Sequence, residues 1–336
     1  MIFTLFNKRH YLTKFAKTPK SVKKGLVKNF FLLFLLFVTT NMFSYAEFRE
    51  ESSVLQTATG SIYGTLLLPK VDKIFSVAIL ISGSGPTDRN GNQPKLQNNS
   101  LKMLANALAS HGIASLRYDK RAIGQSRIEN LSEEDLRFED YIDDAVAWAK
   151  WLKEKGQFNQ IVVIGHSEGS LIGIIASQKG DVDKFISLAG PGRSADKLLK
   201  EQLGDKTILS YFAFPLIDDL VQGKSVKAPF FLKTLFRGSV QPYLISWFKY
   251  DPSVEISKLA IPCLVVQGTN DIQVTVEDAK QLTSVNNRIK LKIINGMNHV
   301  LKNTKLDKKE NIKSYNQPDL PINKELINEL VYFINL

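Results

Sequence analysis

The chain has 336 residues, of which 44% are hydrophobic and 23% are charged, a composition typical of a globular protein. Its formal net charge of +11 suggests nucleic-acid binding, but 8 of the 44 basic residues lie in residues 1–46, which contain no acidic residue. The other 36 basic and 33 acidic residues leave a net charge of +3, which gives no electrostatic reason to expect a nucleic-acid partner. The single cysteine, Cys263, excludes an intramolecular disulfide, and its apolar neighbours indicate a buried, inert thiol.

Residues 1–46 have the pattern of a signal peptide. A basic stretch precedes the apolar run FFLLFLLFV at residues 30–38, and Ser44 and Ala46 are small residues at the −3 and −1 positions of a cleavage site. We therefore expect a mature chain of residues 47–336 that is periplasmic or secreted. The alternative is a retained membrane anchor at residues 29–43, although the apolar run is about half of the roughly 20 residues that a span needs.

From residue 53 onward, short apolar runs alternate with amphipathic stretches. The apolar runs predict strands at residues 54–59, 62–68, 75–81, 113–118, 160–164, 184–188, 263–267 and 289–294. Helical periodicity predicts helices at residues 101–110, 141–155, 167–178, 276–284 and 324–333. This alternation indicates an α/β fold with βαβ crossovers and a mostly parallel sheet flanked by helices.

Residues 193–257 interrupt the alternation. They contain no convincing buried strand but many aromatic residues, spaced as in short helices. We expect a helical cap insertion at residues 193–257 within a catalytic domain that spans residues 47–336. Its aromatic side chains either pack the insertion onto the rest of the domain or line an apolar pocket, and the sequence leaves both roles open.

The strongest chemical signal is a G-x-S-x-G motif, Gly165-His166-Ser167-Glu168-Gly169, between a predicted buried strand and a predicted helix. This context is typical of a nucleophile elbow, a sharp turn that lifts the serine hydroxyl above the sheet. Ser167 is therefore the candidate nucleophile. The other interpretation is a serine that caps a helix in an ordinary βα loop.

A serine nucleophile needs a base, and the chain has four histidines. His10 lies in the predicted signal peptide, His166 is beside the serine within the elbow, and His111 closes a helix before the nucleophile. His299, in the loop after the last predicted strand, is the remaining candidate.

The third member of a triad orients the imidazole and stabilises its cation. Asp271 follows the predicted strand at residues 263–267, where an α/β-hydrolase order of Ser, Asp and His requires it. Asp278, inside the next predicted helix, and Asp251, at the end of the cap insertion, are the alternatives.

Acyl transfer also needs N–H donors for the oxyanion. We expect one donor to be the amide of Glu168, and the other to be the amide of Ser84, or of Gly85, in the glycine-rich loop after residues 75–81. This loop has no dinucleotide or P-loop pattern, and the chain has no H-E-x-x-H motif or paired cysteines, so we expect no cofactor and no metal. The charged residues 119–121 predict a structural loop at the rim of the site, without a catalytic role.

Six segments together make the chain resemble the α/β-hydrolase superfamily, and within it the bacterial esterases grouped with serine-aminopeptidase-like and dienelactone-hydrolase-like members. They are ISGSGPTDRNGN (81–92), LRYDKRAIGQS (116–126), IGHSEGS (164–170), LAGPGR (188–193), VVQGTNDIQV (265–274) and GMNHVLK (296–302).

The resemblance implies an eight-stranded, mostly parallel sheet, hydrolysis without a cofactor, and a triad of Ser167, Asp271 and His299. Two positions depart from the family pattern. Ser82 replaces a histidine that often opens the oxyanion loop, and Ala122 stands where many relatives carry glycine.

The expected activity is therefore two-step acyl transfer, as in a carboxylesterase that acts on a small-molecule ester with a small to medium acyl group. An acyltransferase or an exopeptidase would use the same triad. The exopeptidase would also need an acidic group for the substrate's amino terminus, for which Glu168, Asp218 and Asp219 are candidates. A non-catalytic binding protein on the same scaffold is the alternative from another class, and no obligate protein partner is inferred.

Overall fold

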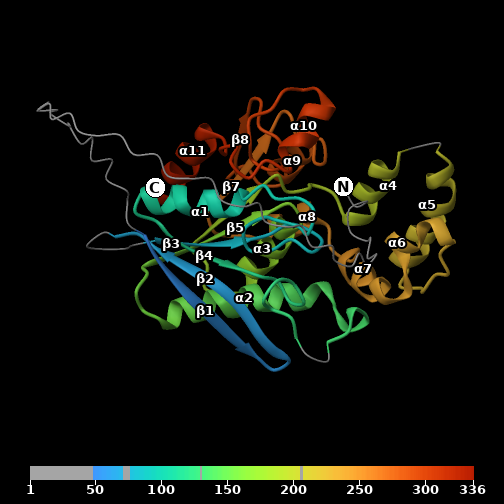
Figure 1. Ribbon diagram of the computed structural model, residues 1–336, viewed down its shortest axis with the longest axis horizontal. Helices are drawn as coiled ribbons and strands as arrows, with labels where there is room; N and C mark the ends of the chain where they lie inside the picture. The colour runs from blue at the N-terminus through green and yellow to red at the C-terminus, as the bar shows by residue number, and fades with distance from the viewer. Residues whose placement is uncertain (1–47, 71–75, 129–130, 205–206) are drawn as a thin grey trace, which may run out of the picture.

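The computed structural model describes residues 48–70, 76–128, 131–204 and 207–336 (Figure 1). The predicted signal peptide, residues 1–46, lies outside the described residues. The described chain forms an eight-stranded sheet with the order β1-β2-β4-β3-β5-β6-β7-β8. Strand β2 is antiparallel to β1 and β4, and the other neighbouring pairs are parallel. This is the sheet that the sequence resemblance implied.

Each of the eight predicted strands is present. Their bounds are β1 (Arg49–Thr57), β2 (Gly60–Leu68), β3 (Ser76–Ile81), β4 (Ala114–Tyr118), β5 (Gln160–His166), β6 (Lys184–Leu188), β7 (Cys263–Gly268) and β8 (Lys290–Ile294). The prediction is wrong for β1, which begins at Arg49 instead of residue 54. Strand β1 lies at the sheet edge and its first residues are mostly exposed, so they show no apolar alternation.

Helices cover both faces of the sheet (Figure 1). Outside the cap insertion they are α1 (Ser100–Ser110), α2 (Phe138–Glu154), α3 (Glu168–Lys179), α9 (Val276–Ser284), α10 (Lys308–Ser314) and α11 (Lys324–Asn335), with a 3₁₀ helix η2 (Glu133–Asp135). Helix α2 begins three residues before its predicted start. Helix α10 was not predicted, because its sequence KKENIKS lacks apolar periodicity and it buries Asn311 and Ser314 instead.

The two faces of the sheet bury separate apolar layers. Alternate side chains of β3 point to opposite faces, as strand geometry requires. Val77 and Ile79 pack in the layer with α2, α3 and α9, whereas Ala78 and Leu80 pack in the layer with α1 and α11. The central strands are therefore buried on both sides, which explains their continuous apolar runs.

The cap insertion contains α4 (Ala195–Leu203), α5 (Ile208–Val221), η3 (Phe230–Leu232), α6 (Lys233–Phe236), η4 (Gly238–Val240), α7 (Gln241–Trp247) and α8 (Pro252–Ser257). Helices α4 to α7 share an apolar core of their own and gather at one end of the molecule (Figure 1). Helix α8 instead packs against the sheet layer through Ile256. In the described ranges, no helix combines the length and apolar character that crossing a bilayer requires.

Candidate active site

Ser167 lies at the turn between β5 and α3. Its backbone adopts φ 56° and ψ −121°, a conformation that costs energy for a residue with a side chain. A Cβ on Gly165 would lie 2.2 Å from the carbonyl oxygen of Gly169, and a Cβ on Gly169 would lie 2.4 Å from the carbonyl oxygen of Ile81. Both glycines of the motif are therefore required by close backbone approach.

Asp271 and His299 come from loops after neighbouring strands and meet at the same place. The Asp271 Oδ2 atom accepts a hydrogen bond from His299 Nδ1 at 2.8 Å and another from Gln267 Nε2 at 3.0 Å. The Oδ1 atom accepts from the backbone N–H groups of Gln273 and Val274, at 2.8 and 3.0 Å. These four bonds fix the carboxylate and, through it, the imidazole ring.

The Asp271 carboxylate is held in its charged form. Burial acts to raise its pKa, but the interaction with His299 and the backbone hydrogen bonds outweigh burial, so the pKa of Asp271 lies below its usual range. Because Asp271 accepts the Nδ1 hydrogen, the Nε2 atom of neutral His299 has a free lone pair. The two alternatives are engaged elsewhere, since Asp278 binds Arg193 and Asp251 caps α8.

His166 contacts both the backbone and the ring of His299. Its Nε2 atom donates a hydrogen bond to the carbonyl oxygen of His299 at 2.7 Å, and the two ring centroids are 4.9 Å apart. Burial, and then the neighbouring His299, lower the pKa of His166 to about 4, so it is neutral at pH 7. Sequence reasoning placed His166 beside the nucleophile but did not find this contact, because it joins residues 133 positions apart.

The segment predicted as a rim loop, residues 119–121, is buried. The Asp119 Oδ2 atom accepts a hydrogen bond from Arg89 Nη2 at 2.7 Å. Arg121 Nε donates to Asp144 Oδ2 at 3.1 Å. Ala122, next in the chain, has φ 66°, a left-handed conformation that favours glycine over alanine. No local pattern indicated that this charged segment is internal.

Lys120 lies between the glycine-rich loop that follows β3 and the start of helix α3. Its Nζ atom donates to the carbonyl oxygen of Gly83 at 2.8 Å and to Glu168 Oε1 at 3.1 Å. Tyr243, from the cap helix α7, donates its hydroxyl to the same Glu168 oxygen at 2.9 Å. Gly83 is also close to the nucleophile, since a Cβ there would lie 3.1 Å from the Cβ of Ser167.

A cavity of about 380 Å³ joins the catalytic candidates to the cap insertion. Ser167, His299, Ser84 and Glu168 line one side of it. The apolar residues of the cap insertion that line it are Ala195, Leu198, Leu199, Leu235, Val240, Leu244, Trp247 and Phe248. In the described ranges, no three His, Cys, Asp or Glu side chains gather in a way that could hold a metal ion.

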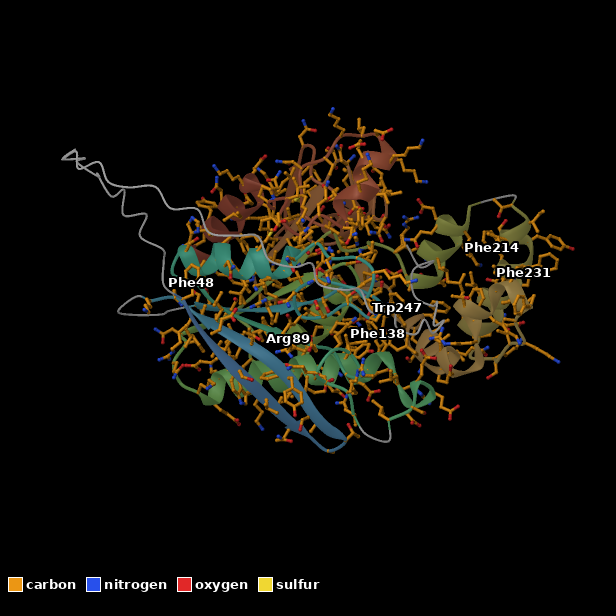
Figure 2. All side chains as sticks on the ribbon, viewed as in Figure 1. Phe48, Arg89, Phe138, Phe214, Phe231 and Trp247 are labelled. Atoms are coloured by element: carbon orange, nitrogen blue, oxygen red, sulfur yellow. The ribbon has the colours of Figure 1, made fainter. Side chains whose placement is uncertain are left out.

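The aromatic residues of the cap insertion divide between the two roles left open by the sequence. Trp247 lines the cavity and stacks on Phe138 of α2, with ring centroids 5.9 Å apart and planes at 11° (Figure 2). Phe231 lies farther out on the cap and is 52% exposed (Figure 2). Phe212, which packs edge-on against Phe231, likewise does not line the cavity.

The strand order, the elbow at Ser167 and the bonded Asp271–His299 pair together define the α/β-hydrolase fold. The chain therefore has the α/β-hydrolase fold. A family model described as "Serine aminopeptidase, S33" matches residues 98–207, which include Ser167 but neither Asp271 nor His299.

The sequence is also similar to that of an esterase. Esterase EstD of Thermotoga maritima is 27% identical over 248 residues, which cover 71% of this chain and 57% of that protein. The chain therefore spans less than two thirds of the length of this relative.

Three solved structures share the fold. Alpha/beta hydrolase GrgF from Penicillium sp. sh18 is 18% identical, with coverage of 85% of this chain and 98% of its own and a TM-score of 0.57. Est1E from Butyrivibrio proteoclasticus is 17% identical, with 85% and 99% coverage and a TM-score of 0.55. Pyrococcus furiosus esterase Pf2001 is 17% identical, with 86% and 91% coverage and a TM-score of 0.55.

Proposed function

We propose that this protein is a serine hydrolase that cleaves carboxylic esters of small to medium acyl groups through an acyl-enzyme. The observation that carries the proposal is that His299, which is hydrogen-bonded to Asp271, lines the same cavity as Ser167 at its strained elbow. The name of the relative EstD, an esterase, supports the same reaction class.

In the proposed mechanism, His299 Nε2 takes the proton of the Ser167 hydroxyl as the serine oxygen attacks the ester carbonyl. Asp271 stabilises the resulting imidazolium. The amides of Glu168 and Ser84 hold the oxyanion until His299 gives its proton to the leaving alcohol. A water then loses a proton to His299 and attacks the acyl carbon. The bond from that carbon to the Ser167 oxygen breaks, His299 returns the proton to this oxygen, and the acid leaves.

The lining of the cavity favours an uncharged acyl group. The residues of the cap insertion that line it are mostly apolar, and the charged side chains that reach the cavity are neutralised by partners. Glu168 pairs with Lys120, and Arg237 pairs with Glu133 through an Nε–Oε2 bond of 2.6 Å. Binding in such a site comes from burial of apolar surface, which suits an aliphatic or aromatic acyl chain.

None of Glu168, Asp218 and Asp219 provides the acidic subsite that an exopeptidase needs. The Glu168 carboxylate is already engaged by Lys120 and Tyr243. Asp218 and Asp219 lie on α5 and do not line the cavity. Hydrolysis of aminoacyl anilides in place of esters would restore this alternative, and product analysis with an acceptor alcohol would reveal an acyltransferase.

We also propose that the enzyme acts in the periplasm or outside the cell. The basic, apolar and small-residue order of residues 1–46 supports export. Cell fractionation and the mass of the mature chain test this proposal. Cleavage after Ala46 supports it, whereas an uncleaved chain in the membrane fraction supports the retained anchor at residues 29–43.

The decisive test of the activity is hydrolysis of p-nitrophenyl esters from acetate to octanoate by the purified protein and its Ser167→Ala variant. Loss of the nucleophile should lower kcat by on the order of 10⁶. Ser177→Ala, a buried position of the same helix that does not line the cavity, is the matched control and should keep its activity. A Ser167→Ala variant as active as the wild type would refute the mechanism.

A further inference from the structure

A buried cation contacts the two segments that carry the amides expected to hold the oxyanion. Lys120 follows β4, and its side chain is 2% exposed. Its ammonium contacts Gly83 and Glu168, and lies 4.9 Å from the centre of the Tyr141 ring. Burying a charged group costs free energy even when it is paired and hydrogen-bonded. A buried Lys120–Glu168 pair therefore suggests a function besides packing.

The contact with Gly83 bears on the first oxyanion donor. The Gly83 carbonyl and the Ser84 N–H belong to one planar peptide unit, in which the C=O and N–H bonds of a trans peptide point in opposite directions. The hydrogen bond from Lys120 to the Gly83 oxygen therefore fixes the direction in which the Ser84 N–H points. It also polarises this peptide unit, which strengthens the N–H as a donor.

The contact with Glu168 bears on the second donor. Glu168 is the first residue of α3, so its N–H is one of the groups that a helix cannot satisfy internally. Its carboxylate accepts bonds from Lys120 at 3.1 Å and from Tyr243 at 2.9 Å. The start of the nucleophile helix is thereby tied to the oxyanion loop and to cap helix α7.

We infer that Lys120 is a positioning residue that aligns both oxyanion donors, with Glu168 as its counter-ion and Tyr243 as its link to the cap insertion. The inference rests on the proposed acyl-transfer function. Lys120 acts through Gly83 and Glu168 rather than on the substrate. The Lys120 ammonium thus sets the position of the loop after β3 relative to the start of α3.

The test is the double variant Lys120→Met/Glu168→Gln, which removes both charges together and leaves no unpaired buried charge. The glutamine side chain at position 168 is an uncharged acceptor that Tyr243 can still bond. We expect kcat for p-nitrophenyl butyrate to fall by about 10- to 1000-fold, the upper end matching loss of a whole oxyanion donor. KM should change by less than about three-fold, because the aligned donors act mainly in the transition state.

A second readout does not depend on the substrate. A fluorophosphonate reacts with an activated serine, which displaces fluoride from phosphorus, and the phosphoryl oxygen needs the same donors. The rate of Ser167 labelling should fall in parallel with kcat. If the wild type labels but hydrolyses no ester, the carboxylesterase proposal fails, while the labelling ratio still tests the role of Lys120.

The matched control is Arg121→Met/Asp144→Asn, which neutralises the adjacent buried ion pair. Their side chains are 8% and 2% exposed, and neither lines the cavity. This control should lose stability but keep kcat and the labelling rate within about three-fold of the wild type. A lower kcat in the Lys120→Met/Glu168→Gln variant but not in this control would show that the Lys120–Glu168 pair positions the oxyanion donors. It would exclude a general requirement of catalysis for buried charge pairs.

Retention of wild-type kcat and labelling by a folded Lys120→Met/Glu168→Gln variant overturns the inference, because the pair would then serve stability alone. If that variant does not fold, Glu168→Gln alone decides. It leaves the ammonium on the Gly83 carbonyl but removes its counter-ion, so a lower kcat at unchanged KM supports the inference and an unchanged kcat overturns it. Lys120→Arg, which keeps a cationic donor, should retain more of the labelling rate than the double variant.

Discussion

The candidate active site and the cap insertion depend on different kinds of interaction. At the carboxyl ends of the strands, the site depends on backbone geometry and on directed polar bonds, as at Ser167 with its φ of 56° and at the Asp271–His299 pair. The cap insertion instead rests on apolar packing among α4 to α7. Directed bonds demand particular residues, whereas apolar packing tolerates exchange among side chains of similar volume. The chemistry is therefore specified more tightly than the pocket.

Two glycine substitutions give the largest expected contrast between the regions. Gly165→Ala places a Cβ 2.2 Å from the carbonyl oxygen of Gly169, where only backbone movement can relieve the overlap. We expect a loss of roughly 4 kcal/mol or more of unfolding free energy, or failure to fold. Gly238→Ala, in the cap insertion, meets no atom within 4 Å and should change the free energy by less than about 0.5 kcal/mol.

Urea unfolding of both glycine variants checks this contrast. Ester hydrolysis adds a second measurement, since Gly165→Ala should also displace the nucleophile. Equal stability of the two variants would show that the elbow yields more easily than its geometry indicates.

Features that leave a local pattern in the sequence could be predicted, whereas features that depend on tertiary packing could not. The strands, the elbow and the candidates Ser167, Asp271 and His299 were accessible because each follows from a local pattern, an apolar run or a turn motif, or from chain order. Strand β1 was placed too late because an exposed edge strand has no apolar pattern. Helix α10 was missed because its buried residues are polar.

The buried charges were not accessible in this way. Lys120 lies in a segment of charged residues, which usually indicates an exposed loop, yet its partners come from positions 83 and 168. The contact from His166 to the His299 carbonyl likewise joins distant positions. Pairings of this kind arise from the packing of several elements, and one sequence carries no local signal for them. The cap aromatics could not be assigned for the same reason.

A pH experiment sharpens the comparison, because the cap insertion contains no histidine. The folded pKa of His166, about 4, lies below its value of 6.5 in an unfolded chain. Between these values the unfolded state binds more protons, so stability is complete above about pH 6.5 and is lost as the pH falls toward 4. His166 should therefore account for roughly 2–3 kcal/mol of destabilisation between pH 7 and 4.5.

The variant His166→Gln, which can still donate to the His299 carbonyl, should remove this part of the pH dependence in urea unfolding. His111→Gln is the control, since His111 is exposed at the end of α1. The assignment is wrong if the wild type and His166→Gln lose the same stability between the two pH values.

The smallest effect should come from the cap insertion, and it should change selectivity rather than chemistry. Leu198, on cap helix α4, lines the cavity. Leu198→Trp narrows the cavity, so kcat/KM for p-nitrophenyl octanoate should fall by about ten-fold relative to acetate, in keeping with the modest selectivity of apolar pockets. Val221→Trp, at the C-terminal end of α5, 48% exposed and away from the cavity lining, is the control and should leave this ratio unchanged. An equal loss on all esters would mean that Leu198 supports the catalytic groups themselves, and the division between a sheet that sets chemistry and a cap that sets substrate size would then fail.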